Sequence, residues 1–310
     1  MKIKNLYLLI LLAICWGPSF LFIKIAVAEI APLMLATLRI GIGALILNVL
    51  LLFTGSRLGL SLEFWKNVFI AGFFAQGLPF ILINWGEQYV DSSLASVLNG
   101  LVPIFTILLA HLMTTDERLS VNKIKGVMMG FVGLVILVLP SLYDGVDGSL
   151  AGIVSITIAS VSYAIGIVYI RKYLVDIPSF QAPAAQLLSV TIYLVPLTLF
   201  VYQEFDFQSI SAIAWGSTMI LGVIGTAIAF VIYFKLIEQS SAGYASLVTY
   251  IMPLFGVLLG VMILDESLTL WVIAGATFIL FGIKLTRTTK RSKPKHYKVS
   301  IDPALYSKFR

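Results

Sequence analysis

Two basic residues, Lys24 and Arg39, stand within long apolar stretches of this chain. A cation among apolar side chains needs an acceptor, because burying it unpaired costs free energy. Arg39 therefore either bonds to carbonyl groups at a helix end or holds an anion, such as a carboxylate, in a binding site or gate. Lys24 either extends its ammonium group to the polar boundary or joins Arg39 in an electropositive region, where it would act at a gate.

Aromatic and neutral polar side chains accompany these cations. Trp16 lies just before Pro18, whose ring removes one backbone hydrogen bond from a helix. An aromatic ring there either packs against neighbouring helices or forms one wall of a cavity. Each amide or hydroxyl group either bonds to a neighbouring helix, worth about 1 kcal/mol or less, or lines a cavity that binds a small polar molecule. The candidate cavity residues are Trp16, Ser19, Arg39, Gln76, Asn99, Tyr163, Gln186, Thr249 and Tyr250.

The sequence does not show the residue patterns of an intramembrane enzyme, a metal site or an ATP-driven pump. His111 has no Ser, Cys or carboxylate partner at membrane depth, which disfavours an intramembrane enzyme. Neither His111 nor His296 belongs to a cluster with metal-ligand spacing, and a glycine-rich loop of the Walker type is missing. We therefore expect no catalytic residue, no metal, no cofactor and no ATP-driven step.

The composition indicates a membrane protein. Of the 310 residues, 59% are hydrophobic and 12% are charged, and the mean hydropathy is +1.00. Such a chain carries more apolar side chain than a water-soluble core uses. The net charge of +6 suggests nucleic acid at first, but the positive residues gather in short loops and one tail, as membrane topology requires. We expect membrane lipid and no nucleic acid among the partners.

Ten apolar runs are long enough to cross ~30 Å of hydrocarbon at ~1.5 Å per residue. They must be helices, because an open strand would leave backbone groups unpaired in lipid. With both termini in the cytoplasm, 19 of the 21 Lys and Arg residues fall on the cytoplasmic side, and the other two are Lys24 and Arg39. The ten runs are residues 5–27, 32–54, 66–86, 92–114, 123–141, 149–170, 181–203, 211–235, 241–264 and 268–286.

The second half of the chain repeats the first. Ala-Ser, Pro and Phe at positions 95–96, 103 and 105 recur 150 residues later, and the Glu-x-Leu, Gly and Gly that follow recur 149 residues later, including Glu266 as the copy of Glu117. Five helices per half is an odd number, so the halves enter the membrane from opposite sides as inverted repeats. The predicted units are a first repeat of residues 1–141, a second of 142–286 and a basic cytoplasmic tail of 287–310.

The repeat also pairs particular residues. At an offset of 147 residues, Trp16, Lys24 and Arg39 correspond to Tyr163, Arg171 and Gln186. Pro103 and Pro253 occupy equivalent places in their helices, where each either makes a static kink or serves as a hinge.

In these sequence features the chain resembles the EamA-like branch of the drug/metabolite transporter superfamily. The resemblance rests on Trp16-Gly17, on Pro32 followed by Arg39, and on the duplicated segment, and it covers about residues 5–286. It implies an all-α membrane protein of ten transmembrane helices in two five-helix repeats. It also implies carriage of small metabolites, often amino-acid efflux from bacteria, through a central cavity that opens alternately to each side.

We predict a secondary transporter of the bacterial inner membrane that carries small polar metabolites, foremost amino acids or their derivatives, as a monomer or homodimer. The alternatives are an exchanger or uptake carrier for another metabolite, such as a nucleoside-like or adenosyl compound, and more remotely a channel or an intramembrane enzyme. No Asp or Glu lies deep within a predicted helix, and the nearest, Glu87, is close to a helix end. A carboxylate relay for proton coupling is therefore not expected from the sequence.

Overall fold

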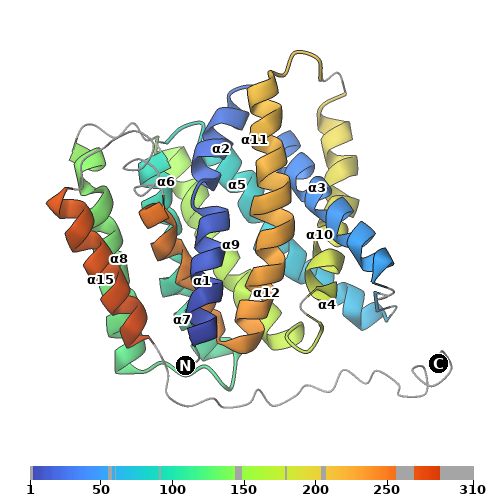
Figure 1. Cartoon of the computed structure of the whole chain (residues 1–310). Helices are drawn as coiled ribbons and strands as arrows, with labels where there is room; N and C mark the ends of the chain where they lie inside the picture. Colours follow the sequence, from blue (N-terminus) through green and yellow to red (C-terminus); the bar gives the residue numbers. More distant parts are fainter. Residues whose placement is uncertain are drawn as a thin grey trace.

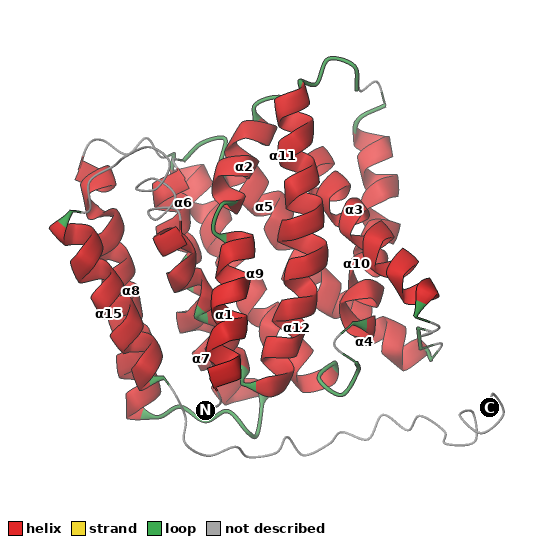
Figure 2. Cartoon of the chain, viewed as in Figure 1, coloured by secondary structure: helices red, strands yellow, loops and turns green. Residues whose placement is uncertain are grey.

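The computed structural model describes residues 3–54, 58–59, 61–90, 92–143, 149–178, 180–203, 207–255 and 269–286. In this part of the chain the helices lie side by side as one bundle, and no β-strand is present (Figures 1 and 2). Seven of the helices are long and apolar enough to cross a membrane, and shorter apolar helices accompany them. The predicted all-α membrane class is confirmed, whereas the count of ten spans stays a prediction.

The helices of the first half begin and end close to the predicted runs. They are α1 (Ile3–Trp16), α2 (Ser19–Val27), α3 (Pro32–Phe53), α4 (Leu62–Gly72), the π-helix η1 (Phe73–Gly77), α5 (Leu78–Gly86), α6 (Ser92–Asn99), α7 (Val102–Met113) and α8 (Val121–Tyr143).

The second half follows the same plan. Its helices are α9 (Leu150–Tyr173), α10 (Gln181–Val201), α11 (Ala212–Gly222), the π-helix η2 (Val223–Ile228), α12 (Ala229–Gln239), α13 (Ala242–Ser246), which continues as Ala242–Phe255, and α15 (Leu270–Leu285). Glu266 and the tail 287–310 lie outside the described residues.

Local sequence signals place several helix starts. Ser61, Ser149, Ser211 and Ser241 are N-cap residues of α4, α9, α11 and α13, and each hydroxyl oxygen accepts a hydrogen bond from the backbone N–H three residues later. Such a cap satisfies one of the four N–H groups that a helix start leaves free.

Successive spans run in opposite directions, so the bundle has two ends. We call the end where α1 begins the N-side and the end where α2 finishes the far side (Figure 1). α5 and α10 finish at the far side, while α9 and α12 finish at the N-side.

Four repeat glycines bring α8 and α15 together. A Cβ on Gly126 would lie 2.6 Å from the Gly282 carbonyl oxygen, and one on Gly133 would lie 2.8 Å from the Gly275 oxygen. The reverse approaches are as short, at 2.5 and 2.7 Å. Small residues allow helix backbones to approach closely in lipid. The duplicated glycines therefore recur because each faces a glycine of the other repeat within one chain.

This contact gives a stability prediction. Gly133→Ala should lower the melting temperature of the purified protein, because the added methyl group forces α8 and α15 apart at a cost of about 1–3 kcal/mol. Gly216→Ala in α11 is the matched control, since a Cβ there meets nothing within 4 Å and Ala favours a helix by about 1 kcal/mol over Gly. Equal melting temperatures for the two variants would contradict the close contact.

Several spans are interrupted near their middles. α1 gives way to α2 at Gly17 and Pro18, and α6 gives way to α7 at Gly100 and Leu101. The two π-helices stand 150 residues apart, at equivalent places of the two repeats. A π-turn shifts the backbone hydrogen-bond ladder, and such turns are frequent at functional sites. Sequence periodicity did not indicate these turns.

The two repeat prolines are not placed alike with respect to the breaks. Pro103 is the second residue of α7, directly after the Gly100–Leu101 break, where its missing N–H costs no helix bond. Pro253 lies within the helix Ala242–Phe255, six residues after the turn at Leu247. At Pro103 we expected a kink within one helix, but the structure has a break between α6 and α7 just before this proline. The hinge role of both prolines stays a prediction.

Candidate functional site

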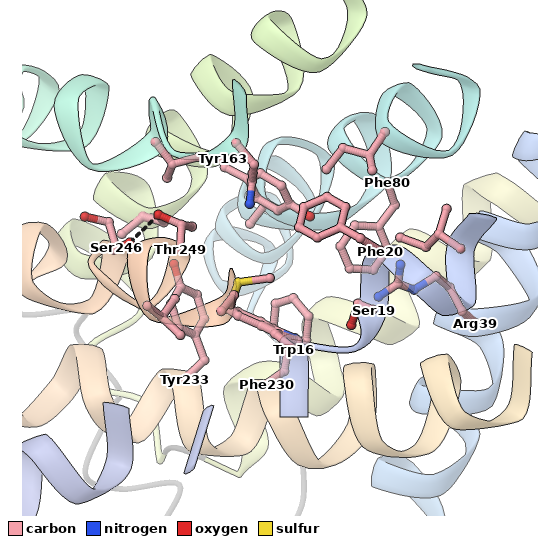
Figure 3. A pocket seen from close by; sticks show the side chains of 18 residues that line it. Trp16, Ser19, Phe20, Arg39, Phe80, Tyr163, Phe230, Tyr233, Ser246 and Thr249 are labelled. Carbon is pink, nitrogen blue, oxygen red and sulfur yellow. Dashed lines mark hydrogen bonds between the residues drawn. The ribbon is translucent and has the colours of Figure 1, made fainter. Parts of the chain in front are cut away.

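A cavity lies between the interrupted helices in the middle of the bundle. It has about 710 Å³ of empty space, counting the part that is open to solvent, and its walls come from both halves of the chain. Figure 3 shows Arg39, Ser19 and Phe20 at one end of the cavity, and Ser246 and Thr249 at the other. The cavity thus has two polar ends and an aromatic middle.

Five aromatic rings form a connected part of the cavity wall. The Trp16 ring centroid is 5.7 Å from that of Phe230 and 5.1 Å from that of Tyr233. Phe80 contacts both Tyr163, at 6.3 Å, and Phe230, at 6.2 Å. These separations are in the range of favourable edge-to-face contacts. The rings come from α1, α5, α9 and α12, so they tie the two halves together around the cavity.

Arg39 supplies the positive charge of the cavity. Its side chain is 4% exposed, and its guanidinium carbon lies 3.9 Å from the centre of the Phe80 ring. The Nε atom is buried without a hydrogen-bond acceptor, and the described residues give the group no ion pair. A cation–π contact offsets part of the cost of burial but satisfies none of the five N–H donors. The guanidinium is therefore available to a planar anion in the cavity.

The opposite end of the cavity carries neutral polar groups. The Thr249 hydroxyl donates to the Ser246 carbonyl oxygen at 3.0 Å, and the Ser246 hydroxyl donates to the Gly243 carbonyl oxygen at 2.9 Å. Asn99 is 5% exposed, and its Oδ1 is buried without a donor. This end therefore offers two hydroxyl oxygens as acceptors, and the Asn99 amide oxygen is a further acceptor of the cavity wall.

The break in the first span and the π-turn in η2 fit one another. The Trp16 indole Nε1–H donates to the Gly225 carbonyl oxygen at 2.8 Å. In an unbroken helix, that carbonyl would accept from the N–H four residues later. Within the π-turn the carbonyl accepts from Trp16, and this bond holds the indole ring at the cavity wall.

Six of the nine predicted cavity residues line the cavity, and three do not. Those that line it are Trp16, Ser19, Arg39, Asn99, Tyr163 and Thr249. Tyr250 points elsewhere, because its hydroxyl donates to the Val127 carbonyl oxygen at 3.0 Å and its ring packs on Gly130 of α8.

Gln76 and Gln186 are the other two. Both are 0% exposed, and neither amide side chain has a hydrogen-bond partner among the described residues. Gln76 belongs to η1, and Gln186 belongs to α10, which packs against α4 and η1. Gln186 does not line the cavity, although its repeat partner Arg39 does.

The aromatic wall contains residues that the sequence analysis missed. Phe80 and Phe230 contact each other at 6.2 Å, and they stand 150 residues apart, the offset of the repeat. Duplication of a phenylalanine was the available signal, but an aromatic residue in an apolar helix does not stand out by composition. Phe20, Tyr233 and Ser246 also line the cavity.

Repeat-related cations bind helix ends on opposite sides of the bundle. At the far side, the Lys24 Nζ donates to the carbonyl oxygens of Glu87, at 2.7 Å, and Val90, at 3.1 Å. At the N-side, the Arg171 Nη1 donates to the Ile237 carbonyl oxygen at 2.9 Å. Ile237 stands 150 residues after Glu87, so both repeats make the same contact between their first and third spans. Lys24 is exposed and does not line the cavity.

Acidic residues reinforce the N-side contact. Arg171 forms ion pairs with Asp116, at 2.8 Å, and Glu117, at 3.7 Å. The Glu117 carboxylate also accepts from the backbone N–H groups of Ala242, at 2.6 Å, and Gly243, at 3.2 Å. Glu117 thereby caps the start of the helix Ala242–Phe255, where an anion is favourable. The N-side is thus held by charged groups from two segments, Arg171 of α9 and the acids Asp116 and Glu117, and by the backbone of a third.

A second contact lies at the far side. The Glu29 carboxylate, between α2 and α3, accepts from the backbone N–H and the hydroxyl of Ser211, both at 2.7 Å. These two hydrogen bonds lower the pKa of the Glu29 carboxyl group from its usual value. The contact joins the α2–α3 loop to the start of α11.

Full-length relatives carry transporter names. An uncharacterized transporter of Archaeoglobus fulgidus is 28% identical over 288 residues, which cover 90% of this chain and 97% of that protein. The uncharacterized transporter YoaV of Bacillus subtilis is 26% identical, with 93% and 98% covered. The uncharacterized inner membrane transporter YedA of Escherichia coli is 27% identical, with 90% and 89% covered.

The fold has also been seen before. A solved crystal structure is similar to this chain with a TM-score of 0.74 at 17% identity, covering 92% of this chain and 96% of the other. The model of the EamA-like transporter family matches the chain twice, over residues 3–139 and 150–288. The repeat, the apolar bundle and these two matches agree, and the chain belongs to the EamA-like transporter family, as a multi-pass small-molecule transporter of the bacterial inner membrane.

Proposed function

We propose that this transporter carries small carboxylate-bearing metabolites, foremost amino acids or their derivatives, out of the cell by alternating access around the central cavity. The proposal rests mainly on one observation. Arg39 presents a guanidinium group to the cavity and forms no ion pair among the described residues.

A carboxylate matches this guanidinium. Two parallel N–H donors of an arginine fit the two oxygens of one carboxylate, and such bonds are stronger than neutral ones. Phe80 fixes the plane of the guanidinium from one side, so little side-chain entropy is lost on binding. The buried site also removes water that would compete for the anion.

The remaining walls suit the rest of an amino acid. The aromatic rings of Trp16, Phe230 and Tyr233 offer a surface for an apolar side chain. The acceptor oxygen of Thr249, at the end away from Arg39, and that of Asn99 in the cavity wall suit an N–H donor on larger derivatives.

The two repeat-related cation contacts support alternating access. In our proposal ten spans form two inverted repeats, residues 1–141 and 142–286, and the N-side and the tail 287–310 face the cytoplasm. The Lys24 contact then closes the periplasmic end and the Arg171 contact closes the cytoplasmic end. Releasing one while keeping the other opens the cavity to one side, and Pro103 and Pro253 are the proposed hinges.

Counterflow in liposomes tests this function. Purified protein is reconstituted into vesicles loaded with an unlabelled mixture of the twenty L-amino acids, and uptake of each labelled amino acid is followed. We expect saturable uptake of at least one of them that depends on the internal load. Exchange of labelled nucleosides or an adenosyl compound, with none for amino acids, would overturn the substrate class. Flux that does not saturate would favour a channel over a carrier.

A further inference from the structure

Glu87 differs from the other buried glutamate described in this chain. It is the residue directly after α5, it is 0% exposed, and both of its carboxylate oxygens are buried without a hydrogen-bond partner among the described residues. Glu117, at 4% exposed, uses its oxygens on two backbone N–H groups and on Arg171. Glu87 is therefore buried as deeply as Glu117, but it lacks the hydrogen bonds and the ion pair that stabilise a buried carboxylate.

The charged groups around Glu87 are few. α5 packs against α2, α3, α9 and η1. α2 carries Lys24, α3 carries Arg39, η1 carries no titratable residue, and the titratable residue of α9 that lines the cavity here is Tyr163. Lys24 and Arg39 are thus the cations that the neighbouring helices α2 and α3 bring to this region, and neither forms an ion pair with Glu87 among the described residues.

Both cations are held away from the carboxylate by other contacts. The Lys24 Nζ is bonded to the backbone carbonyl oxygens of Glu87 and Val90. The Arg39 guanidinium lies over the Phe80 ring and faces the cavity. Lys24 already bonds to the Glu87 main chain, which makes it the candidate partner for a charged Glu87 side chain.

An unpaired carboxylate ion is unfavourable in such a place. Burial removes its hydration, and nothing in the described surroundings replaces the lost hydrogen bonds. A bound proton removes the charge and converts the group into a donor. Asn84, one turn earlier on α5, is 0% exposed and has a buried Oδ1 atom without a donor. Residues three apart lie on one face of a helix, so a neutral Glu87 supplies the kind of group that Asn84 lacks.

We propose that Glu87 is the proton-carrying residue of this transporter and that its protonation is coupled to the substrate cycle. In the described conformation the neutral carboxyl group is stable, and Lys24 stays on the carbonyl oxygens at the far side. When the Lys24 contact opens, the carboxyl group gives its proton to water and the carboxylate pairs with Lys24, which keeps all of its own protons. One proton is bound and released in each cycle, and the neutral form is needed to close the far side.

The coupling rests on the proposed function, but the protonation itself does not. Infrared difference spectroscopy of the purified protein during a pH titration reads the carbonyl band of a buried neutral carboxyl group without any substrate. We expect this band at neutral pH in the wild type and in the control Glu63→Gln, which changes an exposed acid in the first turn of α4. Glu87→Gln should lack it. A wild type without the band at neutral pH would overturn the proposal.

Thermal melting gives an independent readout of the same proton. A proton that the folded chain holds and the unfolded chain releases stabilises the fold at low pH, and this contribution is lost as pH rises. Glu87→Gln mimics the neutral form at every pH. Its melting temperature should equal that of the wild type at acidic pH and exceed it at alkaline pH. A difference that does not change with pH would contradict a held proton.

The coupling is tested in vesicles that enclose a pH-sensitive dye. The probe is the equimolar mixture of the twenty L-amino acids used for counterflow. In the wild type, addition of the mixture should move protons across the membrane, and an imposed pH gradient should drive net flux. Glu87→Gln should keep counterflow within about twofold and lose both proton effects. Gradient-driven flux that persists in Glu87→Gln, or wild-type counterflow without any proton movement, would overturn the coupling. No counterflow at all in the wild type would instead reject the proposed function, with the infrared result unaffected.

Discussion

Arg39→Gln is expected to reduce amino-acid counterflow by at least about tenfold, because glutamine offers one weak donor group where arginine offers a charged, bidentate one. The loss should appear mainly as weaker substrate binding, read as a higher half-saturation concentration in counterflow. Arg39→Lys should be intermediate, since it keeps the charge but replaces the planar fork by a compact ammonium group.

The stability of this variant separates a binding role from a structural one. The Arg39 side chain is buried and its Nε has no acceptor, so its removal relieves a desolvation cost. Arg39→Gln should therefore melt at the same temperature as the wild type or higher while transport is lost, as is common for residues kept for function. Lys125→Gln, which also replaces a cation by glutamine but at an exposed position of α8, should change neither property. A clear drop in melting temperature of Arg39→Gln would show that Arg39 mainly supports the fold.

The N-side charge cluster should give the largest stability effect. Glu117→Ala removes the acceptor of the Ala242 and Gly243 N–H groups and one of the two carboxylates that pair with Arg171. Leaving buried partners unsatisfied costs about 3 kcal/mol. The melting temperature in detergent should fall accordingly, and net flux should become leakier because the N-side closes less often.

A double-mutant cycle identifies the cause. If the two residues act through their contact, Glu117→Ala combined with Arg171→Ala should cost clearly less than the sum of the single changes. Glu63→Ala, at an exposed position of the same end, should stay within about 0.5 kcal/mol of the wild type. Additive costs for the pair would contradict the role of the cluster as a unit.

Helix positions were predictable because lipid imposes one rule on every span. A backbone without water must close its hydrogen bonds internally, so a long apolar run is a helix. The run 181–203 became α10 (Gln181–Val201), and the run 32–54 became α3 (Pro32–Phe53). The break ahead of Pro103 and the π-turns η1 and η2 were not predictable, since they depend on groups from distant segments, such as the Trp16 indole at Gly225.

The candidate cavity was predictable in part. A buried arginine and a mid-helix tryptophan mark positions where lipid contact is costly, and both line the cavity. Gln186 shows the limit of this reasoning, because an amide is tolerated equally well between packed helices. Gln186 lies where α10 packs against α4, with its carbonyl oxygen 3.2 Å from the position that a Cβ on Gly72 would take.

The sequence alone was enough to assign a membrane transporter of two similar halves. The evidence was the composition, the distribution of Lys and Arg and the 150-residue repeat, and all three can be read from the chain without knowing which residues touch. Which side chains meet came only from packing. Phe80 and Phe230 join across the repeats, and Glu87, which looked like an ordinary residue of a helix end, is fully buried with no hydrogen-bond partner for its carboxylate among the described residues. The surroundings of a side chain depend on neighbours that are far away along the chain, and no local pattern contains them.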